Sequence, residues 1–242
     1  MYDDFARIYD RFQEIEYDKF VEFYEEIFGD GKPKTIIDLG CGSGNITIPL
    51  AKRGYKAAGI DISAEMLSLA QNKAFENNLD IMFLNQDMTC FEFSEKVDAV
   101  ISSLDCINYL AEIKDVMRMF KSVYKALNAG GIFIFDINSE YKLKEILGNN
   151  TFVYEDDEAY CVWDCGYFPE DEIVSFDLNF FIKDKSGMYE RYSEYQEERI
   201  YSIEELKSTA EECGFAEINV FADLAFEQPR EKSERIFFVL RK

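Results

Sequence analysis

Three glycines alternate with other residues in a short segment, Asp38-Leu39-Gly40-Cys41-Gly42-Ser43-Gly44, which could hold a ligand against the backbone. Glycine readily adopts positive φ, and it has no Cβ to keep a ligand away from the chain. A nicotinamide or flavin fingerprint, G-x-G-x-x-G, would place its third glycine one position later, and a phosphate-binding loop would need Gly-Lys-Ser/Thr. The spacing therefore disfavours both ligands. The alternative that this segment is a tight turn, which needs glycine only for packing, stays open.

Three carboxylates each follow an apolar run. Asp38 precedes the first glycine by two positions, Asp61 follows Gly44 by 17 residues, and Asp87 comes after a third run. A carboxylate at Asp38 repels pyrophosphate but suits ammonium and hydroxyl groups, and Asp61 could accept both hydrogens of a ribose diol. For Asp87, an adenine contact and a capped or solvated turn both stay open. S-adenosylmethionine (SAM) is a cationic ligand with such ammonium and hydroxyl groups.

The elements that must position these residues alternate along the chain. The apolar runs predict strands at 35–39, 57–60, 81–84, 97–102 and 132–136, and helical periodicity predicts helices at 45–52, 64–77 and 113–127. This alternation is typical of βαβ units and of a mostly parallel sheet. The turn Asn128-Ala129-Gly130-Gly131 is a stop signal for the helix before it. The carboxyl ends of such strands meet at one edge, where the glycine segment and Asp61 come together.

The flanking segments have other patterns. Apolar and aromatic residues at helical spacing predict a helical lead-in over 2–28. Residues 151–201 alternate like antiparallel strands, so we expect a β lid insertion there. A helix at 203–213, opened by a capping box of Ser202 and Glu205, and strands at 216–221 and 235–240 then complete the main domain. That domain comprises 1–150 and 202–242.

The composition disfavours several classes of partner. With 26 Lys+Arg against 48 Asp+Glu, the net charge of -22 repels polyanions, so direct nucleic-acid binding is disfavoured. The chain has no histidine and six scattered cysteines, so we expect no metal site and no disulfide. No run reaches the length of a membrane span, and the first residues lack a signal-peptide pattern. We expect a cytoplasmic protein.

The sequence resembles the class I (Rossmann-like) SAM-dependent methyltransferases, especially the small bacterial type that opens with Y-x-x-F-A-x-x-Y-D. Tyr2, Phe5-Ala6 and Tyr9-Asp10 fit that opening. The resemblance implies a doubly wound α/β fold whose seven-stranded sheet has the order 3-2-1-4-5-7-6, with strand seven antiparallel. It also implies SAM as cofactor and S-adenosylhomocysteine (SAH) as product.

The resemblance carries cofactor-binding roles onto matching positions. These are Tyr9, Asp38, Gly40, Cys41, Gly42, Gly44, Asp61, Ile62, Asp87, Met88, Ser103 and Leu104. Within this set, the loop at 38–44 would hold the methionyl part, Asp61-Ile62 the ribose and Asp87-Met88 the adenine. The Cys41 thiol is expected to pack inside the loop, because transfer from a sulfonium needs no protein nucleophile.

Sequence patterns say less about the residues that would bind the methyl acceptor. Because histidine is absent, Asp105 and Tyr109 are the best-placed candidate bases after the fourth strand. The substrate-binding candidates are Tyr17, Asn108, Trp163, Tyr195 and Arg199. Core packing is the alternative for the aromatic residues, and an ion pair with Glu197 or Glu198 is the alternative for Arg199.

We therefore expect methyl transfer to a nitrogen or oxygen atom of a small-molecule acceptor. Two alternatives stay open: a methyltransferase-like binding module without turnover, and an enzyme acting on RNA or ribosomal protein. We expect a monomer or a homodimer.

Overall fold

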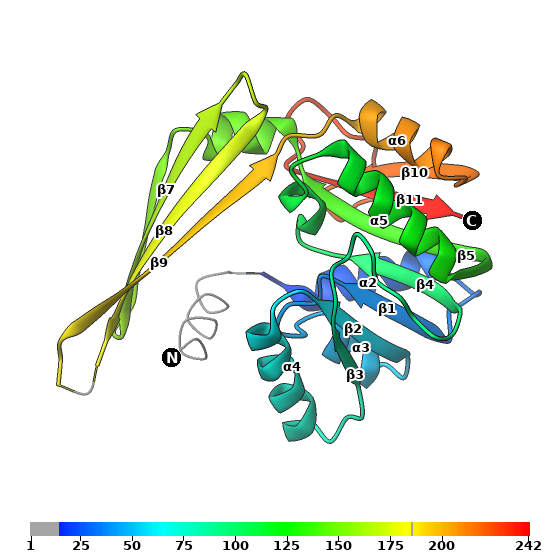
Figure 1. Cartoon of the computed structure of the whole chain (residues 1–242), viewed down its shortest axis with the longest axis horizontal. Coiled ribbons are helices and arrows are strands. Elements are labelled where there is room, and N and C mark those ends of the chain that lie inside the picture. The colour runs from blue at the N-terminus through cyan, green and yellow to red at the C-terminus, as the bar shows by residue number, and fades with distance from the viewer. Residues whose placement is uncertain (1–14, 185) are drawn as a thin grey trace.

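The computed structural model describes residues 15–184 and 186–242, which form two sheets (Figure 1). The helices are α2 (Tyr17–Phe28), α3 (Thr47–Lys52), α4 (Ala64–Glu76), η1 (Cys106–Tyr109), α5 (Ile113–Ala126), η2 (Lys142–Leu147) and α6 (Ile203–Glu212). The larger sheet contains β1 (Thr35–Leu39), β2 (Lys56–Asp61), β3 (Met82–Asn85), β4 (Val97–Ser102), β5 (Leu127–Asn138), β10 (Glu217–Ala222) and β11 (Arg235–Arg241). The smaller sheet contains β6 (Thr151–Glu155), β7 (Ala159–Phe168), β8 (Ile173–Lys183) and β9 (Tyr189–Arg199).

The strands of the larger sheet run in the order β10-β11-β5-β4-β1-β2-β3. Strands β1 to β5 are parallel to one another, whereas β11 is antiparallel to both β5 and β10. Numbered within this sheet alone, the order is 3-2-1-4-5-7-6, so the predicted fold class is confirmed. The order reverses between β1 and β4, and open α/β sheets bind ligands at the carboxyl ends of strands at such a point.

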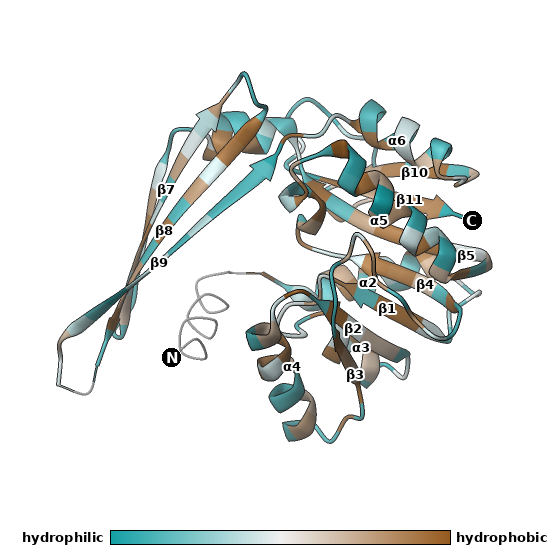
Figure 2. Cartoon of the chain, in the orientation of Figure 1, coloured by the Kyte–Doolittle hydropathy of each residue, from teal (hydrophilic) through white to brown (hydrophobic). Residues whose placement is uncertain are grey.

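Apolar side chains pack on both faces of the larger sheet, whose central strands are coloured as hydrophobic over much of their length in Figure 2. Helices α5 and α6 bury residues such as Phe120 and Leu206 against one face. Helices α2 and α3 bury residues such as Tyr24 and Leu50 against the other. A strand covered on both sides needs apolar residues at successive positions. This packing holds the strand ends, and the loops that follow them, in place.

The smaller sheet is antiparallel throughout, and it extends away from the larger sheet (Figure 1). Along β8 the buried residues Phe176, Leu178 and Phe180 alternate with the more exposed Asp177 and Asn179. Such alternation is typical of a sheet with one covered face. We call the face that carries Phe176, Leu178 and Phe180 the inner face.

Several local features differ from the sequence-based expectations. Residues 128–131 do not form a separate turn, because they belong to β5, whose register against β4 shifts between Val97 and Ala99. Gly130, at a φ of 73°, permits this bulge, and the preceding helix ends without a glycine cap. The π-helical turn η2 was not predicted. Tyr2, Phe5 and the rest of the lead-in before residue 15 lie outside the described residues.

Membrane, metal and thiol features complete the description. Within the described residues, no helix is long and apolar enough to cross a membrane. The same residues contain no group of three or more His, Cys, Asp or Glu side chains placed to hold a metal ion. The six cysteines are free thiols.

Candidate active site

A cavity of about 1070 Å³ lies between the carboxyl ends of the parallel strands and the inner face of the smaller sheet. The loop after β1 and the end of β2 border one side, and β7, β8 and β9 border the other. Its polar lining includes Asp38, Ser43, Asp61, Glu65, Ser103, Asp105, Asn138, Lys142, Glu194, Gln196, Glu198 and Arg235. The cavity therefore lies where the strand order predicts a ligand.

The glycines of the loop after β1 meet different requirements. Gly40, Gly42 and Gly44 have φ values of 77°, 51° and 80°. A Cβ on Gly40 would lie 2.6 Å from Cys106 Sγ, and one on Gly44 would lie 3.2 Å from Ala70 Cβ. A Cβ on Gly42 would meet nothing within 4 Å, although Gly42 borders the cavity. Gly40 and Gly44 thus permit close packing, whereas Gly42 leaves the backbone accessible to a ligand.

Two carboxylates lie beside this loop. Asp61 accepts hydrogen bonds from the N–H groups of Gly42 and Ser63, each at 2.8 Å. Asp38 is buried and accepts a 2.6 Å hydrogen bond from the Thr47 hydroxyl. Burial raises the pKa of Asp38 to about 7; the hydrogen bond from Thr47 opposes this rise, and the charge of Asp61 adds to it. A cationic ligand would favour the ionised form of Asp38.

The segment after β4 has an unusual backbone conformation. Leu104 and Asp105 have φ values of 63° and 55°, in the left-handed region that non-glycine residues seldom adopt. Their N–H groups donate to the two carboxylate oxygens of Asp136, at 2.9 and 3.0 Å. The Ser103 hydroxyl shares a 2.7 Å hydrogen bond with the Tyr24 phenol of α2. Strained backbone of this kind persists where its surroundings fix it, and it is concentrated at functional sites.

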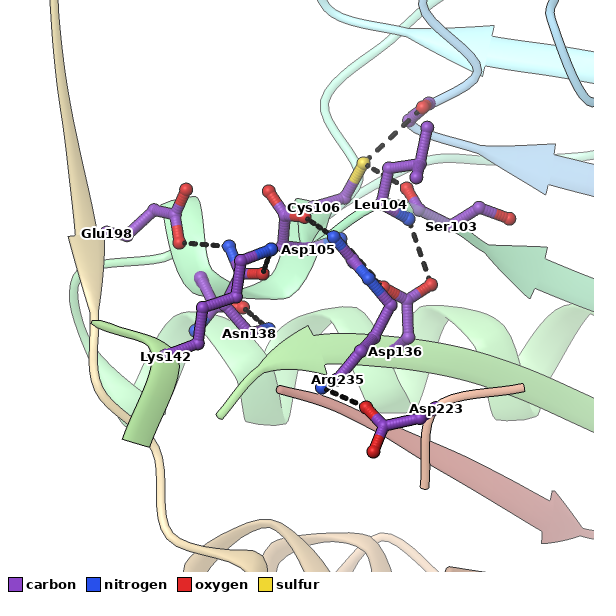
Figure 3. Close-up of polar contacts among 12 residues, drawn as sticks. Ser103, Leu104, Asp105, Cys106, Asp136, Asn138, Lys142, Glu198, Asp223 and Arg235 are labelled. Carbon is purple, nitrogen blue, oxygen red and sulfur yellow. Dashed lines mark hydrogen bonds and ion pairs between the residues drawn. The ribbon is translucent and has the colours of Figure 1, made fainter. Parts of the chain in front are cut away.

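A largely buried arginine, whose side chain is 16% exposed, links this segment to the last strand (Figure 3). Arg235, the first residue of β11, forms ion pairs with Asp136 and, at 2.8 Å, with Asp105. Burial raises the pKa of Asp136, and the charge of Arg235 opposes that rise. Burial by itself lowers the pKa of Arg235, but the two carboxylates raise it above its usual value. Neither Asp136 nor Arg235 was predicted from the sequence, where their only signal is a charged residue at the end of a buried strand.

A second polar cluster borders the cavity beside Arg235 (Figure 3). Asn138 Nδ2 donates to Glu198 Oε2, and Lys142 Nζ donates to Asn138 Oδ1, both at 2.9 Å. Burial raises the pKa of Glu198, which is 3% exposed, and the charge of Asp105 adds to the rise. Burial lowers the pKa of Lys142, and the charge of Arg235 adds to that shift. Without a ligand both shifts favour neutral side chains, and a cationic group placed beside Glu198 would favour its ionised form. Sequence reasoning missed this cluster as well.

Most of the sequence-predicted site residues border the cavity. They are Asp38, Gly40, Cys41, Gly42, Asp61, Ser103, Leu104, Asp105, Tyr109, Tyr17, Trp163 and Tyr195. Six others lie away from its lining: Gly44, Ile62, Asp87, Met88, Asn108 and Arg199. Tyr9 lies outside the described residues.

Three of the six have contacts that explain their placement. Asp87 Oδ1 accepts a hydrogen bond from the N–H of Thr89 at 2.7 Å, so this side chain stabilises a turn, which was one of the two alternatives for it. Asn108 is fully buried; its Nδ2 donates to the carbonyl of Arg199 at 2.9 Å, and its Oδ1 accepts a backbone N–H of β5 at 3.0 Å. The Arg199 guanidinium forms an ion pair with Glu205 at 2.8 Å, so its main carboxylate partner lies in α6 rather than beside it in β9.

Comparison with known proteins gives the family. A family described as "Methyltransferase domain" matches residues 36–131. Two relatives are each 35% identical to this chain over its whole length. One is from Geobacillus sp. (strain WCH70), and the other is "Putative methyltransferase YqeM" from Bacillus subtilis (strain 168). The alignments cover 99% and 97% of those two proteins. The crystal structure of a SAM-dependent methyltransferase from Clostridium acetobutylicum ATCC 824 superposes with a TM-score of 0.91 at 33% identity, covering 99% of this chain and 98% of that one. The chain belongs to the SAM-dependent methyltransferases.

The loop end of the cavity fits the cofactor of this methyltransferase. SAM, when bound, supplies a methyl group activated by a sulfonium and carries an ammonium group and a ribose diol. Gly42 leaves space for such a ligand against the backbone, whereas Asp38, Asp61 and Glu65 bring carboxylates to the same end of the cavity. Three carboxylates suit those groups and would repel the phosphates of a dinucleotide.

Proposed function

We propose that this methyltransferase transfers the methyl group of SAM to a nitrogen or oxygen atom of a small-molecule acceptor held between the two sheets. The observation that carries the proposal is the continuous cavity, which reaches from the loop after β1 to the inner face of the smaller sheet. Ligand pockets typically have volumes of about 300–1,000 Å³. A volume of about 1070 Å³ suits a cofactor and an acceptor lying together.

In this proposal each end of the cavity has its own role. We assign the methionyl part of SAM to residues 38–44, the ribose to Asp61 and the methyl junction to Ser103 and Leu104. The adenine would lie toward Asp87, in the turn after β3. The smaller sheet, within residues 151–201, serves as a lid over the carboxyl ends of the strands.

Methyl transfer is an in-line displacement, so the protein contributes chiefly by aligning the acceptor atom and excluding water. Asp105 and Tyr109 border the cavity beyond the cofactor loop. The Tyr109 phenol donates to Gln196 Oε1 at 3.0 Å, and Asp105 is held by Arg235. These contacts fix both side chains, and we assign them to hydrogen bonding or proton transfer at the acceptor atom.

The charge balance of the cavity favours nitrogen as the acceptor atom. Among the described residues, its lining has six acidic side chains, Asp38, Asp61, Glu65, Asp105, Glu194 and Glu198, and two basic ones, Lys142 and Arg235. Arg235 is already paired with two carboxylates. The excess of negative charge attracts a cationic amine more strongly than a neutral alcohol.

Oxygen is the second candidate, and Lys142 is the observation that favours it. Burial lowers the pKa of Lys142, so its neutral form is more accessible than that of an exposed lysine. A neutral amine bordering the cavity could remove the proton of a phenol or another acidic hydroxyl.

Binding and turnover assays test the proposal separately. Calorimetry with SAM and SAH measures the cofactor site, and SAH formation with panels of amines and phenols measures transfer. Asp61→Ala should weaken SAM binding by about tenfold or more, because a hydrogen bond to a charged group is worth about 1.5–3 kcal/mol. Asp80→Ala removes an exposed carboxylate before β3 and should leave binding unchanged.

Three outcomes would contradict parts of this proposal. Failure to bind SAM or SAH at high micromolar concentration would remove the cofactor site. SAH formation only with RNA or ribosomal protein would exclude the small-molecule acceptor. Tight SAM binding without turnover on any panel would support a binding module.

A further inference from the structure

We propose that the acceptor is an amine carried on an apolar alkyl or aryl body, with its ammonium group bound at Glu198 and its body bound against the inner face of the smaller sheet. This inference rests on the proposed function and narrows its acceptor to one chemical class. Two features carry it. The inner face is divided into an apolar and an acidic strip, and a buried carboxylate lies at one end of these strips.

The inner face is divided along its length. Its apolar strip consists of Trp163, Phe176, Leu178 and Phe180, from β7 and β8, and its acidic strip consists of Glu194, Gln196 and Glu198, from β9. The register of β8 with β9 places Phe176 opposite Gln196 and Leu178 opposite Glu194. A ligand lying along the strands would therefore meet hydrocarbon on one side and carboxylates on the other.

The apolar strip suits a hydrophobic body rather than a hydrated one. Phe176, Leu178 and Phe180 are 2%, 6% and 1% exposed, and they border the cavity as well as packing within their own sheet. From Phe176 to Phe180 the strip spans four residues, about 13 Å at the rise of a strand. Each methylene group buried against it should improve affinity about fourfold. A polyhydroxylated acceptor would lose water here and gain no such contact.

Glu198 lies where the acidic strip meets the larger sheet. Its Oε2 accepts a hydrogen bond from Asn138, and the charged groups that face it are Asp105, Lys142 and Arg235. An ammonium group placed at Glu198 would form a charge-assisted hydrogen bond and compensate for the burial of the carboxylate. An alcohol brings no such charge, so this position selects an amine. Before transfer the bound ammonium gives one proton to the carboxylate of Glu198 or Asp105, and the freed nitrogen lone pair forms the bond to the methyl carbon as the methyl–sulfur bond of SAM breaks. The acidic strip then extends from this anchor alongside the apolar strip.

The wild-type protein saturated with SAH provides the first test. Calorimetry would measure the binding of primary n-alkylamines from butylamine to octylamine, the alcohols of the same chain lengths, and glucosamine as a polar amine. We expect Kd to fall about fourfold per methylene, and each amine to bind about tenfold or more tightly than its alcohol. No dependence on chain length, equal binding of amines and alcohols, or glucosamine binding more tightly than octylamine would overturn the inference.

Paired variants test the two strips separately. Glu198→Gln should weaken amine binding about tenfold or more and leave alcohol binding unchanged. Its control is Glu197→Gln, which changes the adjacent residue on the exposed face of β9. Phe180→Ala should weaken octylamine binding about tenfold and butylamine binding little. Its control is Phe181→Ala, on the other face of β8. Unchanged SAH affinity shows that each variant is folded, and equal effects in a variant and its control would contradict the inference.

Binding without turnover separates this inference from the proposed function. If alkylamines bind as expected but no amine or phenol of the panels is methylated, the proposed function fails and the binding site stands. If phenols or polar amines are methylated while the alkylamine series shows no gain with chain length, the proposed function stands and this inference fails.

Discussion

Replacing Arg235 with methionine would test how the buried charges of the site are held. The substitution keeps most of the side-chain length and removes the cation that pairs with Asp136 and Asp105. The Asp136 side chain is fully buried, whereas that of Asp105 is 15% exposed. The variant therefore leaves an ionised carboxylate buried beneath the cavity without its counter-ion.

The structure sets the expected size of this effect. Removing one partner of a buried ion pair costs about 3–5 kcal/mol. Asp136 would keep its two backbone N–H donors, from Leu104 and Asp105, so we expect the lower end of this range. For a chain of this size the melting temperature should fall by about 6–12 °C. The control Arg230→Met breaks a pair with Glu227 in which the two side chains are 78% and 61% exposed, and it should cost at most about 1 kcal/mol.

The loss should also depend on pH, which calorimetric melting can measure. Burial raises the pKa of Asp136 and Arg235 opposes the rise, so the pKa should rise further in the variant. A carboxyl group with a raised folded-state pKa contributes stability that is present below its unfolded pKa, about 3.9, and is lost as the pH rises through its folded pKa. The deficit of Arg235→Met relative to wild type should therefore grow as the pH rises from the unfolded-state pKa, about 3.9, toward neutrality. A deficit below about 1 kcal/mol, or one that is constant over this range, would refute the role given to Arg235.

Three further predictions concern the loop after β1 and the contact of η1 with β9. Because burial raises the pKa of Asp38 to about 7, binding of cationic SAM near pH 7 should release part of a proton. Calorimetry in buffers of different ionisation enthalpy detects this release, and Asp38→Asn should abolish it. Gly42→Ala should weaken SAH binding with a modest loss of melting temperature, whereas Gly40→Ala, whose Cβ would meet Cys106 Sγ, should lower the melting temperature more. Asn108→Ala removes two buried hydrogen bonds and should accelerate amide exchange at the base of β9.

Much of the fold was readable from the sequence because its determinants are local. Strands covered on both faces show as apolar runs, and the helix at α6 begins where expected, with Ser202 Oγ accepting the N–H of Glu205 at 3.1 Å. The comparisons confirm the family, the fold class and the cofactor. The start of β5 was misread, because residues 128–131 fit a helix stop as well as a bulged strand. The pattern cannot show that the backbone at 130–131 pairs with Lys242.

The residues predicted for the cofactor side are close to one another in the sequence, whereas the cluster around Arg235 and Glu198 was not predicted. The glycine loop and Asp61 each follow directly from one strand. Arg235 meets Asp136 across 99 residues and Asp105 across 130 residues, and no periodicity links them. Glu198 alternates along β9 with exposed neighbours, so its sequence pattern is that of a solvated strand edge. Only the packing of the smaller sheet against the larger one makes it a buried group.

This difference in origin separates recognition of the methyl donor from recognition of the acceptor. The domain match covers residues 36–131 and therefore contains the loop and Asp61, but Asn138, Lys142, Glu198 and Arg235 all lie beyond it. Each of these four contacts at least one of the others or a carboxylate of the same cluster. A substitution at one position therefore changes the hydrogen bonding or charge of its partners. Under the proposed assignment, the part of the acceptor site that these four residues build could diverge as a unit while the loop stays suited to SAM, so relatives that share the loop need not share the acceptor.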